Sequence, residues 1–116
     1  MENEKVFSMK FSKMYPYLIQ KAERKNRAKE EVFEVTSWLT GYTAREIEEM
    51  MEGDITYGDF FRNAPEINPN ASLIKGSVCG VKLETIEDPL MKQIRYLDKL
   101  VDELAKGKPM EKILRK

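Results

Sequence analysis

The chain has 116 residues, 41% of them hydrophobic and 34% charged, which is typical of one folded domain spanning residues 1–116 and not of a disordered chain. It contains no histidine, which excludes Ser-His-Asp and Cys-His catalysis, histidine metal ligands and histidine pH switches. Twenty basic and twenty acidic residues give a formal net charge of zero.

The first expected element is a β-strand over about 5–11, because the sequence there alternates between apolar and polar residues, as a half-buried strand does. The apolar side chains that share one face are Phe7, Met9 and Phe11. Proline is favoured in the first turn of a helix, so Pro16 predicts a helix over about 16–25.

Three helices are expected in the middle of the chain, each with a signal at one end. The first covers about 28–39 and stops at Gly41. Thr43 and Glu46 form a capping box for the second, and Thr56 caps a short third helix. The apolar residues expected to face inward are Val32, Val35, Leu39, Ile47, Met50, Met51, Phe60 and Phe61.

The segment after these helices allows two interpretations. A short helix over about 69–75 followed by a strand over 77–85 is the preferred one, with the strand at 5–11 as its partner. The alternative is one helix over 71–86, whose two internal glycines would cost about 2 kcal/mol relative to alanine. Strand and helix therefore stay open for this segment.

A long helix over about 89–105 is the clearest element, because Asp88 can cap it and Gly107 can end it. Apolar residues recur along it at spacings of four and three, namely Leu90, Ile94, Leu97, Val101 and Leu104. This stripe can face the core of the domain, and it can also serve as the seam of a possible homodimer through the helix 89–105. Pro109 begins a last short helix.

Together these elements predict a mainly α fold. We expect a small single-domain orthogonal helical bundle with a possible minor two-stranded β element, formed by about 5–11 and 77–85. No run of apolar residues has the roughly 18 residues that a membrane span needs, so no membrane partner is expected.

Two features could suggest chemistry, and we interpret both as structural. The single cysteine, Cys79, has only Lys75 and Lys82 as nearby cations in the sequence, so it is predicted to be a buried scaffold residue and not a reactive thiol. Residues 28–52 resemble a helix-turn-helix corner, but the second helix carries Arg45 against four glutamates. The sequence therefore disfavours nucleic-acid binding there.

The sequence predicts no catalytic, cofactor-binding or metal-binding residue. Its paired acids are adjacent in sequence and point apart on a helix, so they do not form an acid–base dyad. It has no phosphate-binding glycine loop and no cluster with metal-ligand spacing.

Charge is distributed unevenly along the chain. Residues 1–29 carry eight basic and three acidic residues, residues 30–66 two basic and ten acidic, and residues 67–116 ten basic and seven acidic. These blocks are expected to form opposite faces that cancel, with a basic patch for an anionic partner as the alternative. The acidic start of the chain and the single cysteine predict a cytoplasmic location.

Four segments in order cover nearly the whole chain: KVFSMKFSKMYP at the start, WLTGYT at 38–43, FFRNAPEINPNASLIKG at 60–76 and CGVKLETIEDPLMKQIRYLDKLVDELAKGKPMEKIL at 79–114. Together they resemble the bacterial family catalogued as domain of unknown function 2200. The resemblance implies a small, mainly helical cytoplasmic protein and brings no reaction, cofactor or catalytic residue. The sequence departs from the family pattern at Asn26 and Ala28, where glycine and threonine are expected.

The function predicted from the sequence is a non-enzymatic cytoplasmic module that binds an unknown protein or small-molecule partner. An enzyme with an active site that lacks histidine is the alternative, and a nucleic-acid-binding module with the corner at 28–52 is the third. A concave pocket lined by titratable groups with shifted pKa values would favour the enzyme.

Overall fold

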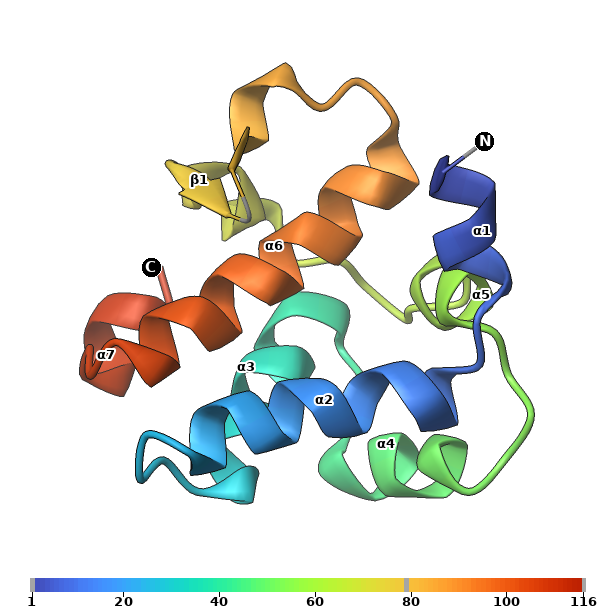
Figure 1. Ribbon diagram of the computed structural model, residues 1–116, viewed down its shortest axis with the longest axis horizontal. Helices are drawn as coiled ribbons and strands as arrows, with labels where there is room; N and C mark the ends of the chain where they lie inside the picture. The colour runs from blue at the N-terminus through green and yellow to red at the C-terminus, as the bar shows by residue number, and fades with distance from the viewer. Residues whose placement is uncertain (1, 79, 116) are drawn as a thin grey trace.

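The computed structural model describes residues 2–78 and 80–115, and this part of the chain is mainly α-helical, as predicted (Figure 1). The helices are α1 (Glu2–Ser8), α2 (Phe11–Glu23), α3 (Lys29–Thr40), α4 (Ala44–Met51), α5 (Tyr57–Arg62), α6 (Pro89–Ala105) and α7 (Met110–Ile113). The shorter elements are the 3-10 helices η1 (Pro69–Leu73) and η2 (Leu83–Thr85) and the strands β1 (Ser77–Val78) and β2 (Val81–Lys82).

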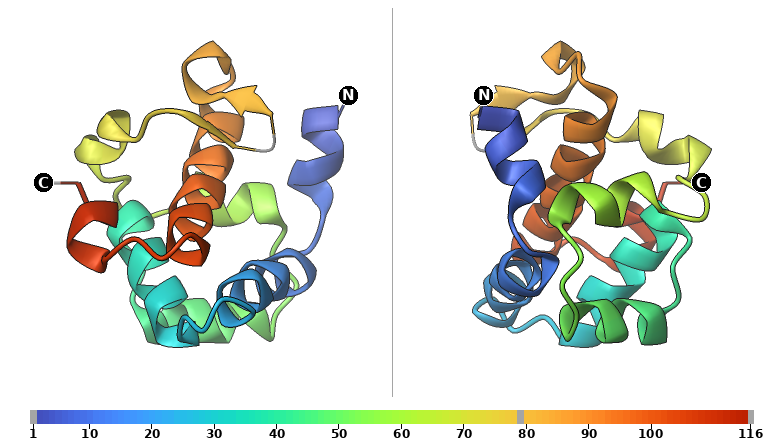
Figure 2. Two further views of the ribbon diagram at one scale, coloured as in Figure 1. Left: turned by 60° about the vertical axis from the view of Figure 1, so that its left-hand side comes forward. Right: turned by 90° about the vertical axis from the view of Figure 1, so that its right-hand side faces the viewer.

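Helix α6 is the centre of the bundle. It crosses the molecule with α2 and α3 packed against it, α7 beyond its C-terminal end and the β-hairpin along its side (Figures 1 and 2). Its N-terminus is capped as predicted, because the Asp88 carboxylate accepts hydrogen bonds from the backbone N–H groups of Leu90 and Met91. The predicted stripe faces the core: Leu90 is half-buried and its other four residues are at most 2% exposed.

An aromatic cluster joins α2 to α5. The rings of Phe11 and Phe60 stack with their centroids 4.1 Å apart, and Phe61 meets Phe60 edge-on at 5.1 Å. Tyr15 stacks on Phe11 at 4.8 Å, one helical turn further along α2. All four rings are buried, so this cluster fixes the position of the N-terminal half of α2, whose opposite face is on the surface.

The middle helices follow the predicted signals. Helix α3 ends at Gly41, whose φ of 84° is the left-handed conformation that glycine adopts at little cost. The capping box is present, since the Glu46 N–H donates to the Thr43 hydroxyl oxygen and the Glu46 carboxylate accepts from the Thr43 N–H. Thr56 caps α5 with its hydroxyl oxygen alone, which accepts a hydrogen bond from the Asp59 N–H.

The predicted strand at 5–11 is wrong. Helix α1 continues to Ser8 and α2 begins at Phe11, so only the short connection between them is extended. That connection pairs with the segment before α5 and not with 77–85: Lys10 bridges to Thr56, and the Tyr57 N–H donates to the Met9 carbonyl. The sequence pattern was ambiguous because apolar residues at positions 7 and 11 fit the four-residue spacing of a helix as well as the period of a strand.

The predicted start of the next helix is also wrong. Helix α2 begins at Phe11, and Pro16 is its sixth residue, in the second turn. There proline removes the backbone hydrogen bond that residue 16 would donate to Ser12. Buried side chains spaced along α2 fix its start, namely Phe11, Tyr15, Ile19 and Ala22, and their packing outweighs that one lost bond.

The departure from the family pattern before α3 has a structural counterpart. Asn26 adopts a φ of 65°, the left-handed conformation for which glycine is the usual residue and which asparagine tolerates. Ala28, at the N-cap of α3, has no side-chain hydroxyl, and its backbone N–H donates to the carboxylate of Glu31 instead.

The short helix predicted over about 69–75 is confirmed as η1, but the continuous strand predicted over 77–85 is wrong, and so is the alternative of one helix over 71–86. Strands β1 and β2 pair with each other as an antiparallel hairpin, with Ser77 opposite Lys82, and the chain then turns into η2. Gly80 has a φ of 79° in the connection, as tight hairpin turns require. Local pairing across this turn replaces the long-range pairing with 5–11. Cys79 lies outside the described residues, so its predicted scaffold role stays a prediction.

Candidate functional site

The helix-turn-helix look-alike at 28–52 is a corner between α3 and α4. Tyr42, between the two helices, is buried, and its hydroxyl donates a hydrogen bond of 2.8 Å to the Phe60 carbonyl, which holds the corner against α5. Most of the charged side chains that α4 exposes are acidic: Glu46, Glu48 and Glu49 on the helix, and Glu52 at its C-cap. Arg45 is the basic residue among them. Nucleic-acid affinity depends on replacing counterions with lysine and arginine, so the prediction that this corner does not bind nucleic acid stays a prediction that its acidic surface favours.

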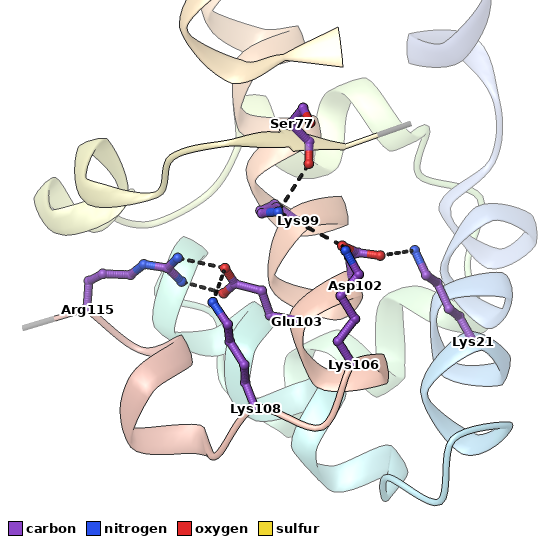
Figure 3. A network of polar contacts seen from close by, with 8 residues as sticks. All are labelled: Lys21, Ser77, Lys99, Asp102, Glu103, Lys106, Lys108 and Arg115. Atoms are coloured by element: carbon purple, nitrogen blue, oxygen red, sulfur yellow. Dashed lines mark hydrogen bonds and ion pairs between the residues drawn. The ribbon is translucent and has the colours of Figure 1, made fainter. Parts of the chain in front are cut away.

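Two neighbouring carboxylates near the C-terminal end of α6, Asp102 and Glu103, each form ion pairs with more than one basic side chain, as Figure 3 shows. The Asp102 carboxylate lies 3.4 Å from Lys21 Nζ of α2, 3.0 Å from Lys106 Nζ and 4.0 Å from Lys99 Nζ. Burial acts to raise the pKa of Asp102, but the hydrogen bonds and charges of Lys106 and Lys21 outweigh it and hold that pKa below its ordinary value. The Lys99 ammonium also donates to the Ser77 carbonyl, which ties β1 to α6.

The second carboxylate, Glu103, is buried and holds the C-terminal segment. Arg115 donates to both of its oxygens, at 2.6 and 2.8 Å, and Lys108 Nζ lies 3.4 Å away. Burial acts to raise the pKa of Glu103, and Arg115 and Lys108 outweigh burial, so the pKa lies below its ordinary value. Nearby, Arg27 donates to the carbonyls of Leu104 and Lys108 at the end of α6. These ion pairs hold elements together and face no groove described below.

The acid–base groups with raised pKa values are packed between helices. Burial raises the pKa of Asp98, although its partner Arg95 at 3.2 Å opposes the shift. Burial also raises the pKa of Tyr57 well above its ordinary value, and that of Tyr15, whose hydroxyl lies 2.7 Å from the Thr36 hydroxyl. Asp98, Tyr57 and Tyr15 line neither of the two grooves described below. Tyr42, whose pKa is also raised by burial and by the charge of Glu46, lines the second of them.

An open groove of about 370 Å³ lies where α1 meets α2. We call it the α1–α2 groove, and its lining residues are Ser8, Met9, Lys10, Lys13, Met14 and Tyr17. Tyr17 is 68% exposed and Met9 is 41% exposed, which is unusual for large apolar side chains in this domain. Lys10 and Lys13 are exposed beside them. The groove is thus partly apolar with a basic rim.

A second groove of about 350 Å³ lies along α4. We call it the α4 groove, and its lining residues are Tyr42, Glu46, Glu49, Met50, Gly53, Asp54 and Ile55. It is acidic where the α1–α2 groove is basic. The two grooves are neighbours, because Lys10 of the first lies 3.4 Å from Asp54 of the second, and Phe11 donates its backbone N–H to the Ile55 carbonyl.

The sequence interpretation missed the α1–α2 groove because it placed Met9 on the inner face of a strand. Placing the start of a helix at Phe11 would have found it. Counted from there, every third or fourth residue of α2 is buried, and Lys13 and Tyr17 fall on the opposite face. An exposed tyrosine beside lysines on the polar face of a helix is the signal.

Within residues 2–78 and 80–115, no three acidic or cysteine side chains lie close enough to hold a metal ion. No helix in that part of the chain is both long and apolar enough to cross a bilayer.

The chain was compared with known proteins in three ways. A crystal structure described as that of uncharacterized protein SP1917 is 51% identical in sequence, covers 96% of this chain and 91% of its own, and superimposes with a TM-score of 0.92. No curated protein matches the chain. The family model described as "Uncharacterized protein conserved in bacteria (DUF2200)" matches residues 5–115. The chain therefore belongs to this bacterial family, as its sequence segments indicated.

Proposed function

We propose that this chain is a non-enzymatic interaction module of the bacterial cytoplasm, and that its α1–α2 groove binds an acidic segment of a protein that also carries an apolar side chain. The observation that carries the proposal is the exposure of Tyr17 and Met9 beside Lys10 and Lys13. Because this domain buries most of its other large apolar side chains, this exposed set has no role in the core.

The apolar part of the groove would supply most of the affinity. Tyrosine and methionine are enriched at protein interfaces, since one offers a rigid amphipathic ring and the other an adaptable side chain. Tyr17 and Met14 are three residues apart on α2 and so share one face of the helix. An apolar side chain of a partner can therefore contact both of them and Met9 at once.

The lysines would select the partner by charge. Exposed ion pairs contribute about 0.2–1 kcal/mol each, so Lys10 and Lys13 would add little affinity, but they would speed the approach of an acidic segment and disfavour a basic one. The groove is small, so we expect a weak and transient complex of the kind that buries less than about 1,200 Å².

The position of the titratable groups supports a binding role over catalysis. Asp98 and Tyr57, whose pKa values are raised by burial, lie outside the α1–α2 groove. The groove itself contains hydroxyl, thioether and ammonium groups without a carboxylate among its lining residues. General acid–base chemistry there would have to use a lysine or a tyrosine, with no carboxylate or histidine to assist it.

The test is fluorescence anisotropy with a labelled acidic peptide that contains one central leucine. Tyr17→Ala should weaken binding about fivefold or more, as expected for a contact worth at least about 1 kcal/mol. Lys13→Glu should also weaken binding, and its effect should be larger at low salt than at high salt. Leu73→Ala and Lys112→Glu are matched controls, because both residues are exposed and outside the groove.

Three results would contradict the proposal. The first is the absence of binding at about 1 mM protein, and the second is binding that Tyr17→Ala leaves unchanged. The third is a preference for a single-stranded oligonucleotide over the peptide, lost in Tyr17→Ala, since an aromatic ring among lysines also suits stacked bases. That last result would make the groove a nucleic-acid site.

A further inference from the structure

The two neighbouring grooves are complementary to each other. The α1–α2 groove is lined by an exposed tyrosine and two lysines, whereas the α4 groove is lined by the half-buried Met50 and Ile55 and by acidic side chains. The α4 groove is therefore acidic and partly apolar, which is the kind of surface that the α1–α2 groove is proposed to bind.

We infer that the partner of the α1–α2 groove is the α4 groove of a second copy of this chain, so that two copies form a closed two-fold dimer. In such a dimer Tyr17 of each copy enters the α4 groove of the other. The inference rests on the proposed function, because it uses the same groove and names its occupant.

Adjacency is what allows the dimer to close. Residues 9–11 run beside residues 54–57, with Lys10 bridged to Thr56 and paired with Asp54. When a basic and an acidic patch lie side by side, a two-fold axis between them brings each patch against its opposite on the partner. Such an interface uses the same surface on both copies and leaves no free patch for further growth.

The charges needed for this contact are available. Within the described part of the chain, Lys13 and Glu49 belong to no ion pair. The pair between Lys10 and Asp54 is highly exposed, at 54% and 94% of the side chains, so exchanging it for a contact between copies costs little. Each copy can therefore offer one lysine and one glutamate to its partner.

The test is sedimentation velocity from about 1 µM to about 1 mM at low salt and again at high salt. The wild-type chain should shift from monomer to dimer as its concentration rises, and more weakly at high salt. Lys13→Glu alone and Glu49→Lys alone should each be monomeric, because each places like charges opposite one another twice. An equimolar mixture of the two variants should dimerise again, because every contact in the mixed dimer joins opposite charges. Arg24→Glu and Glu48→Lys, the same charge changes outside both grooves, should dimerise like the wild type.

Any of three results overturns the inference: a wild type that stays monomeric throughout, a dimer that both single variants retain, or a mixture that stays monomeric. Binding of the acidic peptide is also measured on Glu49→Lys, which leaves the lining of the α1–α2 groove unchanged and should stay monomeric up to about 1 mM protein. A wild type that stays monomeric while Glu49→Lys binds the peptide would refute the dimer alone. A monomeric wild type together with a Glu49→Lys variant that does not bind would refute the proposed function as well.

Discussion

Arg115→Ala should destabilise the fold more than a substitution near a chain end usually does. Arg115 donates two short hydrogen bonds to Glu103, a carboxylate in the centre of the C-terminal part of the bundle whose side chain is 3% exposed (Figure 3). The substitution would leave a buried charge whose remaining cation is Lys108, at 3.4 Å.

The size of the effect follows from this geometry. Removing one partner of a fully buried ion pair costs about 3–5 kcal/mol, because the other charge loses its compensation. Here Arg115 itself is 17% exposed and Lys108 stays close, so we expect a loss of about 2–3 kcal/mol at neutral pH. That is a large share of the roughly 5–15 kcal/mol by which such domains are stable.

Urea unfolding followed by circular dichroism measures this loss. Arg62→Ala is the matched control, because Arg62 and its partner Asp59 are both about half exposed, and it should cost under about 0.5 kcal/mol. Adding Glu103→Gln to Arg115→Ala should restore part of the stability, since no buried charge then remains unpaired.

The loss should also depend on pH. In the folded wild type the pKa of Glu103 lies below its ordinary value of 4.5, so its stabilising contribution is present above pH 4.5 and is lost as the pH falls through the lowered pKa. The difference between wild type and Arg115→Ala should therefore narrow in acid. A loss under about 0.5 kcal/mol at pH 7, or a difference that does not change with pH, would refute the reasoning.

Three further substitutions test the packing and the caps. Gly58→Ala should lower the melting temperature, because the new Cβ would lie 2.8 Å from the Phe7 Cβ. This loss should outweigh the roughly 1 kcal/mol by which alanine usually favours a helix over glycine. In the control Gly53→Ala the new Cβ has no atom within 3.4 Å, so the melting temperature should hardly change. Leu97→Asp should abolish the cooperative unfolding transition, since it places a carboxylate at a position with 0% exposure. Asp88→Ala should cost about 1 kcal/mol in urea unfolding, because it removes the cap of α6; an unchanged midpoint would contradict the capping role.

Helices with local end signals were predictable from the sequence. The capping box at Thr43, the left-handed glycine at Gly41 and the cap at Asp88 act within four residues of themselves, so their meaning does not depend on the rest of the fold. Helices α3, α4 and α6 accordingly begin and end within about two residues of their predicted limits.

The N-terminal part was not predictable in the same way, because its structure depends on distant segments. Apolar residues at positions 7 and 11 suit a strand or a helix, and the packing of α1 on α5 and of α2 on α6 decides between them. The α1–α2 groove was missed for the same reason. Whether Tyr17 is buried or exposed cannot be read from its neighbours until the start of α2 is known.

The central claim, that the α1–α2 groove is the binding surface, is tested most directly by chemical-shift mapping. The isotope-labelled chain would be titrated with the acidic leucine peptide at a concentration where the chain is monomeric. We predict that the largest shifts of backbone amide signals fall on residues 8–17 and on the adjoining residues 54–57, which share the bridge at Lys10. Shifts centred instead on α6 and α7, or spread evenly over the surface, would contradict the account.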